Sequence, residues 1–224
     1  MTGAEVTPDI LLLNANTDNG MTDRMVAHAL RLHRGFRGAT VDSGPPYISD
    51  KASLRAAAKS VERFVGTMAM EQRPDVLIIA CFGDPAVRDL RAHVPFPVLG
   101  LAEASCHVAC QLGRRFGIVT GGQKWPPILQ ELVTEIGLAS RLSGIYALEL
   151  TGDRIAQDRA SARYALKSKV AQAQADGADV VILGGAGLIG FAEELQADFA
   201  VPLLDSVDGA VRLATGLAIR AQSQ

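Results

Sequence analysis

The feature that most constrains the fold of this chain is an internal repeat whose period is close to half its length. The segment Asp75–Gly83, DVLIIACFG, reads closely like Asp179–Gly187, DVVILGGAG, so that Cys81 in the first copy corresponds to Gly185 in the second. Further along, Pro97-Val-Leu in the first copy matches Pro202-Leu-Leu in the second. The repeat therefore predicts two similar halves.

Short apolar runs alternate with amphipathic stretches along both halves. The runs lack polar alternation, which is typical of parallel strands buried on both faces. The expected strands are 10–13, 39–42, 76–80, 98–101, 116–120, 145–148, 180–183 and 201–204. Apolar residues between them recur at helical spacing, and the longer helices are expected over 126–136, 155–175 and 206–219.

This alternation of strands and helices predicts an α/β fold of two pseudo-symmetric lobes. Each lobe is expected to hold a parallel sheet of roughly four strands flanked by helices, with the active site in the cleft between the lobes. We assign residues 1–104 to the N-terminal lobe, to which the chain crosses back over about 206–224, and residues 105–205 to the C-terminal lobe.

The composition argues against several classes of partner. The formal net charge is −2 and no cluster of Lys or Arg is present. The charge of the chain therefore gives no reason to expect binding to nucleic acids or membrane surfaces. No apolar run approaches the ~20 residues of a membrane span, and none resembles a signal peptide, which predicts a cytoplasmic protein. The three cysteines are odd in number and are expected to be free thiols.

The strand ends contain the candidate active-site residues. In open parallel sheets, ligands bind beyond the carboxyl ends of the strands. Asn14, Cys81, Thr120 and Gly185 each follow an expected strand, so we expect all four to face one cleft.

Cys81 lies in the sequence ACFGDP, between a buried strand and an expected helix start. With Asp84 as the N-cap and Pro85 as the first helical residue, the thiol lies near free backbone amides. Amides at a helix N-terminus lower a thiol pKa from its free value of about 8.5 and favour the thiolate. The alternative is that Cys81 is a small, inert hydrophobic residue at a strand end.

Other polar or glycine-rich segments allow both a structural and a functional interpretation. Asn16 and Thr17 either cap the helix that follows or donate to a carboxylate or imide oxygen. The glycines at 121–122 and 184–187 lack the lysine of a phosphate loop and favour close backbone approach to a small ligand. Cys106 and Cys110 lack further metal ligands nearby, so core packing is expected for them. The remaining candidates, His28, His33 and His93, are expected at the surface.

Four segments in this order resemble the aspartate/glutamate/hydantoin racemase superfamily, and its hydantoin and allantoin racemase branch most closely. They are Asn14-Ala-Asn16-Thr17, the CFGDP turn at 81–85, Gly100-Leu-Ala-Glu103-Ala104 and Leu183-Gly-Gly-Ala-Gly187. The resemblance implies two pseudo-symmetric lobes, no metal, pyridoxal phosphate or nucleotide cofactor, and a homo-oligomer. It also implies two cysteines, one in each lobe, that act on opposite faces of the substrate's α-carbon.

The chain departs from that pattern at the second cysteine, because Gly185 occupies its position. The internal repeat independently makes Gly185 the partner of Cys81. We therefore expect a cofactor-independent racemase of a hydantoin-like or amino-acid-like substrate, with Cys81 as thiolate acid/base and a vacant second position. The residues expected to bind the carboxylate or cyclic imide are Asn16, Thr17, Phe82, Gly83, Thr120, Gly121, Ala186 and Gly187. A single-cysteine decarboxylase of disubstituted malonates and a non-catalytic ligand-binding homologue are the alternatives.

Overall fold

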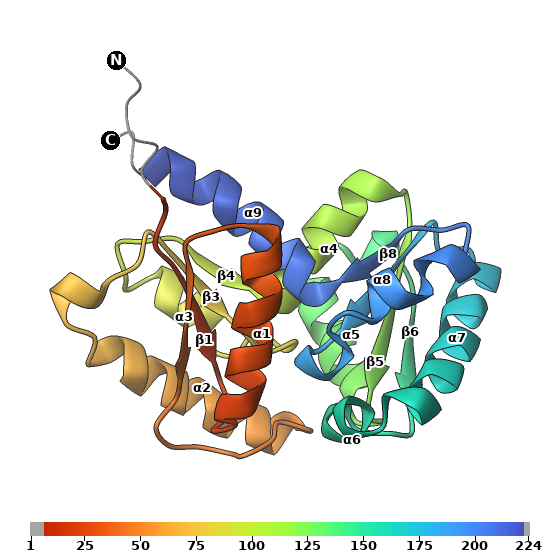
Figure 1. Cartoon of the computed structure of the whole chain (residues 1–224), viewed down its shortest axis with the longest axis horizontal. Coiled ribbons are helices and arrows are strands. Elements are labelled where there is room, and N and C mark those ends of the chain that lie inside the picture. Colours follow the sequence, from red (N-terminus) through yellow and green to blue (C-terminus); the bar gives the residue numbers. More distant parts are fainter. Residues whose placement is uncertain (1–6, 222–224) are drawn as a thin grey trace.

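The computed structural model describes residues 7–221, which form two lobes side by side (Figure 1). Each lobe contains a four-stranded sheet, and the strand orders β2-β1-β3-β4 and β6-β5-β7-β8 are the same arrangement repeated. All pairings are parallel, with Ile10 opposite Val76 in the first sheet and Phe116 opposite Val180 in the second. The α/β fold with two similar lobes, predicted from the repeat, is confirmed.

The first lobe follows the expected alternation of strands and helices. Its elements are β1 (Ile10–Asn14), α1 (Asn19–Leu32), β2 (Phe36–Thr40), α2 (Lys51–Gly66), a 3-10 turn η1 (Met70–Gln72), β3 (Val76–Ile79), α3 (Val87–Arg91), β4 (Val98–Gly100) and α4 (Leu101–Leu112). The strand expected at 39–42 instead spans 36–40, because Phe36 is the buried residue that pairs with Ile10.

The second lobe repeats this order. Its elements are β5 (Phe116–Gly121), α5 (Trp125–Glu135), η2 (Ala139–Arg141), β6 (Leu142–Leu148), α6 (Gly152–Gln157), α7 (Arg159–Ala175), β7 (Val180–Gly184), η3 (Ala186–Leu188), α8 (Phe191–Leu195), η4 (Gln196–Asp198), β8 (Leu203–Asp205) and α9 (Ser206–Ala221). The single helix expected over 155–175 is divided at Asp158, which caps α7 by accepting the Ser161 amide at 3.1 Å.

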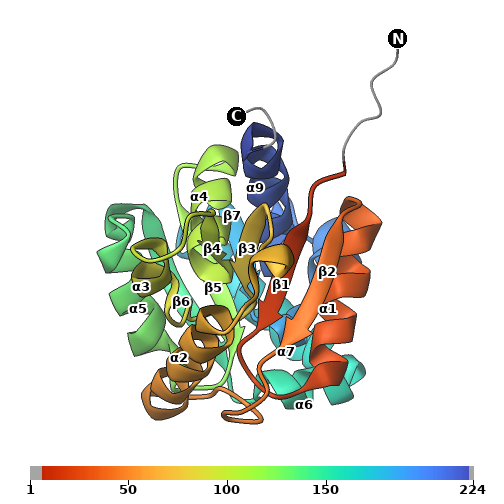
Figure 2. The same cartoon turned by 90° about the vertical axis from the view of Figure 1, so that its left-hand side faces the viewer.

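The two lobes share one hydrophobic cluster, and a second cluster lies on the outer side of the second sheet. Alternate residues of a strand face opposite sides of a sheet, so Phe116 and Ile118 face the first lobe while Val119 packs against α7 on the outer side. The inner side chains join the buried residues of β1 and β3 in a continuous cluster. Helix α9 crosses from β8 onto the first lobe and packs against α4, α1 and β3 (Figures 1 and 2).

Among the described residues, no helix combines the length and the apolar character needed to cross a membrane.

Candidate active site

A small cavity of about 50 Å³ lies between the lobes, at the carboxyl ends of β3, β5 and β7. Both halves of the repeat contribute to its wall, as the strand order requires. The lining residues are Asn16, Met21, Tyr47, Ile48, Ala80, Cys81, Phe82, Thr120, Gly121, Trp125, Gly152, Gly184, Gly185, Ala186, Gly187 and Leu188. The volume is well below the ~300 Å³ typical of small-molecule sites.

Cys81 is partly exposed and follows β3 in a tight turn, in which its carbonyl accepts the Asp84 amide at 3.1 Å. Burial of the thiol, followed by the charge of Asp84, raises the pKa of Cys81 to about 12, although a hydrogen bond from the Gly83 backbone opposes the shift. The thiol is therefore neutral near pH 7. The sequence-based expectation of a lowered thiol pKa was wrong.

The helix-start interpretation of Asp84 and Pro85 was also wrong. Asp84 has a left-handed φ of 49° and α3 begins only at Val87. The Asp84 carboxylate instead accepts the amides of Ala102 and Glu103, at 2.9 and 2.7 Å, in the first turn of α4. Cys81 consequently has a carboxylate nearby in place of helix N-terminal amides, and the charge of this carboxylate adds to the larger effect of burial in raising the pKa of Cys81.

The opposite wall is formed by glycines after β7. A Cβ at Gly184 would lie 2.2 Å from the Phe82 ring, so only glycine lets this ring of the first lobe approach the second lobe. Gly185 has a φ of 116°, which L side chains rarely adopt, and its nearest neighbour in the direction of a Cβ is Leu188 Cδ1 at 4.0 Å. The position that corresponds to Cys81 in the repeat is therefore open space beside the cavity.

The polar residues of the wall make mostly local hydrogen bonds. The Asn16 side-chain oxygen accepts from Asn14 Nδ2 and from the Asp18 amide, at 3.0 and 2.9 Å. Among the described residues, Asn16 Nδ2 donates one hydrogen bond, to Met21 Sδ at 3.6 Å, which leaves its second N–H available to a ligand. Thr120 Oγ1 donates to the Gly184 carbonyl at 3.0 Å.

The structure brings together most of the site residues expected from the sequence. Asn16, Cys81, Phe82, Thr120, Gly121, Gly185, Ala186 and Gly187 line the cavity, whereas Thr17, Gly83 and Asn14 do not. The Thr17 amide donates to Pro45 O, and Gly83 packs against Trp125 and Leu54. Asn14 is buried beneath the wall, where it donates to Asn16 and to the Asp18 carbonyl.

Sequence reasoning missed several wall residues that lie away from the strand ends. Tyr47 and Ile48 belong to the segment between β2 and α2, Trp125 begins α5, and Gly152 begins α6. The Pro45-Pro46-Tyr47 sequence was a possible signal, since an aromatic residue in a rigid loop suits a ligand wall.

The cavity wall is neutral. Among the described residues, no Asp, Glu, Lys, Arg or His side chain lines the cavity, and its only titratable groups are the Cys81 thiol and the Tyr47 phenol. Apolar surface comes from Met21, Ile48, Phe82, Trp125 and Leu188. Such a site binds an uncharged ligand better than an ion, because transferring a charge from water to an apolar site without a partner is costly.

A buried polar cluster lies away from this cavity. His28, expected at the surface, is in fact only 8% exposed, because its Nε2 is 2.5 Å from Asp208 Oδ1. Asp205 completes a group whose ligand atoms all lie within 4.8 Å of one another. The polar atoms of this group already have hydrogen-bond partners within the fold, because the Asp205 carboxylate accepts the amides of Gly190 and Val207.

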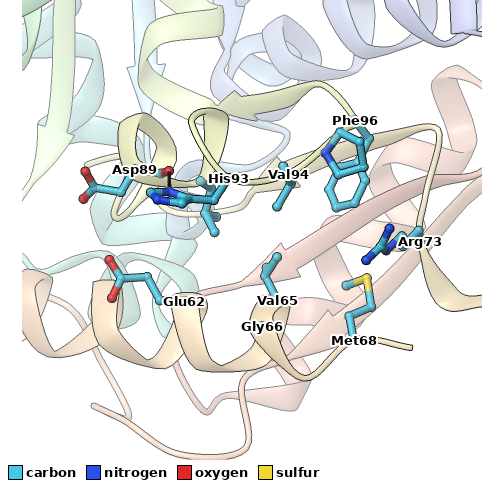
Figure 3. A pocket seen from close by; sticks show the side chains of 11 residues that line it. Glu62, Val65, Gly66, Met68, Arg73, Asp89, His93, Val94 and Phe96 are labelled. Carbon is cyan, nitrogen blue, oxygen red and sulfur yellow. Dashed lines mark hydrogen bonds between the residues drawn. The ribbon is translucent and has the colours of Figure 1, made fainter. Parts of the chain in front are cut away.

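A larger hollow of about 420 Å³ lies on the first lobe between α2 and the segment 89–96 (Figure 3). Glu62 and Asp89 lie toward one end of it, and Arg73 and Phe96 toward the other. Arg73 and Phe96 precede β3 and β4, so the hollow is at the amino ends of these strands. The interlobe cavity with Cys81 is therefore the candidate active site.

Comparisons with known proteins identify the family and the fold of the chain. A family model described as Asp/Glu/Hydantoin racemase matches residues 10–214. The chain is 31% identical over 212 residues to a hydantoin racemase of Paenarthrobacter aurescens, covering 93% of this chain and 90% of that relative. Its fold is similar to that of an allantoin racemase from Klebsiella pneumoniae, with a TM-score of 0.88 and 27% identity over 96% of this chain and 89% of that one. A glycine-to-cysteine, cysteine-to-serine double mutant of arylmalonate decarboxylase has a TM-score of 0.70 at 16% identity, covering 95% of this chain and 93% of that one, a likeness of fold alone.

Proposed function

This chain belongs to the Asp/Glu/hydantoin racemase family and is an enzyme of the racemase type, and on that premise we propose that it racemises a hydantoin-like cyclic imide through Cys81. The observation that carries the proposal is a single thiol in an interlobe cavity whose described wall has no charged side chain. A hydantoin ring is uncharged and offers N–H donors and carbonyl acceptors. The neutral wall therefore favours it over a free amino acid, which has two charges, and over a malonate dianion.

The proposed reaction begins with removal of the α-proton. The Cys81 thiolate takes the hydrogen, so that the C–H bond breaks, an S–H bond forms and the electron pair moves onto the neighbouring carbonyl oxygen as an enolate. Donors aimed at this oxygen stabilise the enolate. The candidates on this wall are the second N–H of Asn16 and the backbone amides of Ala186 and Gly187, because the Gly185 amide donates to Ser206 Oγ at 3.3 Å.

The second proton requires a source on the opposite face of the α-carbon. Gly185 has no side chain to supply it, but the space beside Gly185 is open. We propose that a water at Gly185 protonates the enolate on that face. The hydroxide that remains takes up, through solvent, the proton held on Cys81, so that the thiolate and a neutral water are restored.

Incubation with 5-substituted hydantoins, amino acids and disubstituted malonates in heavy water tests the proposal. We expect deuterium at the α-carbon of a hydantoin together with loss of optical rotation, and no CO₂ from the malonates. Replacing Cys81 by Ala should abolish the exchange, whereas Cys110→Ala, on α4 outside the cavity, should leave it intact. Exchange with full retention would contradict the water-mediated second step. CO₂ release without exchange on hydantoins would contradict racemisation.

A further inference from the structure

Tyr47 lies in the segment 41–50, which joins β2 to α2 and reaches across the cavity to the second lobe. Two interlobe contacts hold this segment in place. The Tyr47 hydroxyl oxygen accepts the backbone N–H of Gly152 at 2.7 Å, and Lys124 Nζ forms an ion pair with Asp50 at 3.0 Å. The Tyr47 side chain is therefore fixed as part of the wall that faces Cys81 and Gly185.

Within the described part of the protein, the hydroxyl group of Tyr47 acts as a hydrogen-bond acceptor but not as a donor. A phenol can accept one hydrogen bond and donate another at the same time. Its oxygen accepts from the backbone of Gly152 and Asp153, whereas within residues 7–221 its O–H makes no hydrogen bond as a donor. Because the residue lines the cavity, this unused donor is available to a ligand inside it.

The protonation state of Tyr47 suits a donor. Burial, above all, raises the pKa of Tyr47 to about 12; the charge of Asp153 and, less strongly, that of Cys81 add to the shift. The hydroxyl therefore keeps its proton across the neutral and mildly alkaline range. Tyr47 and Cys81 both line the cavity.

We propose that Tyr47 is a catalytic residue whose O–H donates a hydrogen bond to the substrate carbonyl oxygen next to the α-carbon. The inference rests on the proposed function. As Cys81 removes the α-proton, the electron pair moves onto this oxygen, and the hydrogen bond from Tyr47 strengthens with the negative charge. The phenol proton stays on Tyr47 throughout, and the Gly152 N–H makes the phenol a stronger donor by stabilising charge on its oxygen.

The competing interpretation is that Tyr47 only ties the segment 41–50 to the second lobe. Lys124 provides the matched control, because its ion pair with Asp50 holds the same segment while its side chain is 71% exposed. A purely structural role predicts similar effects of Tyr47→Phe and Lys124→Ala, mainly on KM. A catalytic role predicts a loss of kcat in Tyr47→Phe alone.

The test measures the steady-state rate of α-deuterium exchange on a hydantoin that the wild-type protein accepts. Loss of one such donor typically lowers kcat by ~10²–10³-fold, so we expect Tyr47→Phe to lose about that much, while Lys124→Ala stays within a few-fold of wild type. Placing 3-fluorotyrosine at position 47, a more acidic phenol with the same shape, should preserve or raise kcat. Circular dichroism and the thermal midpoint serve to check that each variant folds.

The possible outcomes separate the two proposals. A Tyr47→Phe variant that keeps kcat within about threefold of a wild-type protein that does exchange hydantoins would overturn the role of Tyr47 alone. If Tyr47→Phe does not fold, a fall in kcat with 3-fluorotyrosine would overturn it instead. A wild-type protein that exchanges no hydantoin would contradict the proposed function, and the inference with it.

Discussion

Cys81 shows how the surroundings of one residue set its chemistry. Cys81 follows a buried strand, a position from which a side chain can face a ligand. Burial of the thiol and the charge of Asp84 nevertheless keep the thiol protonated. A base must be deprotonated before it can remove a proton from carbon. The proposed reaction therefore depends on the small thiolate fraction present at a given pH, and this fraction has a definite pH dependence.

We predict that alkylation of Cys81 by iodoacetamide accelerates by about tenfold per pH unit from pH 7 to 9. The sign follows from the raised pKa of the Cys81 thiol, about 12, because the thiolate fraction below the pKa grows tenfold with each unit of pH. Mass spectrometry of the Cys81 peptide measures the rate, and the same peptide in urea is the control, since a free thiol approaches its plateau above about pH 8.5. A plateau below pH 8 in the folded protein would contradict the raised pKa.

At the scale of secondary structure, the connection between the Cys81 turn and α4 is the long-range feature that supports the site. Asp84 caps α4 from a turn that precedes the helix by a whole strand, and its carboxylate accepts two buried amides. It also packs against Gly100, where a Cβ would lie 2.1 Å from the carboxyl carbon. One carboxylate thus fixes the turn that presents Cys81 and the start of the helix between the lobes.

We predict that Asp84→Ala lowers the free energy of unfolding by about 2–5 kcal/mol, because it leaves two buried amides without acceptors. Asp158→Ala is the matched control. Asp158 caps α7 at an exposed site through the Ser161 amide, and its loss should cost only about 0.5–2 kcal/mol. Urea unfolding at one pH measures both. Equal losses of unfolding free energy in the two variants would show that the Asp84 cap stabilises the protein no more than an exposed helix cap does.

At the scale of the whole molecule, the two lobes have separate sheets but share the larger of the two hydrophobic clusters. The inner face of the second sheet, α4, α5 and α9 all contribute to the cluster that holds β1 and β3. Trp125, only 6% exposed, packs at the lobe interface, where Gly83 of the first lobe lies against its ring. Neither lobe can unfold without exposing apolar surface of the other.

We therefore predict a single cooperative transition in urea, since shared burial couples the two lobes. The fluorescence of Trp125, the only tryptophan of the chain, reports on the interface, and far-UV circular dichroism reports on the helices of both lobes. The two probes should give the same midpoint. A fluorescence transition at clearly lower urea than the dichroism transition would mean that the lobes separate before they unfold.

The sequence by itself determined the two-lobed α/β fold and most of the cavity wall. These features depend on spacing along the chain, since apolar runs of strand length and a half-length repeat dictate where strands end and which residues follow them. For that reason Cys81, Thr120 and Gly185 were placed correctly at the strand ends.

Only the tertiary structure decided the electrostatics and the remainder of the wall. The pKa of Cys81 depends on burial of the thiol and on the Asp84 carboxylate, which is directed toward α4. His28 is buried where the fold places it against Asp208, a residue 180 positions away in the sequence. Tyr47 and Trp125 reach the cavity from a loop and a helix start whose positions no local periodicity fixes. Desolvation and charge interactions depend on distance in space, which a linear pattern does not encode.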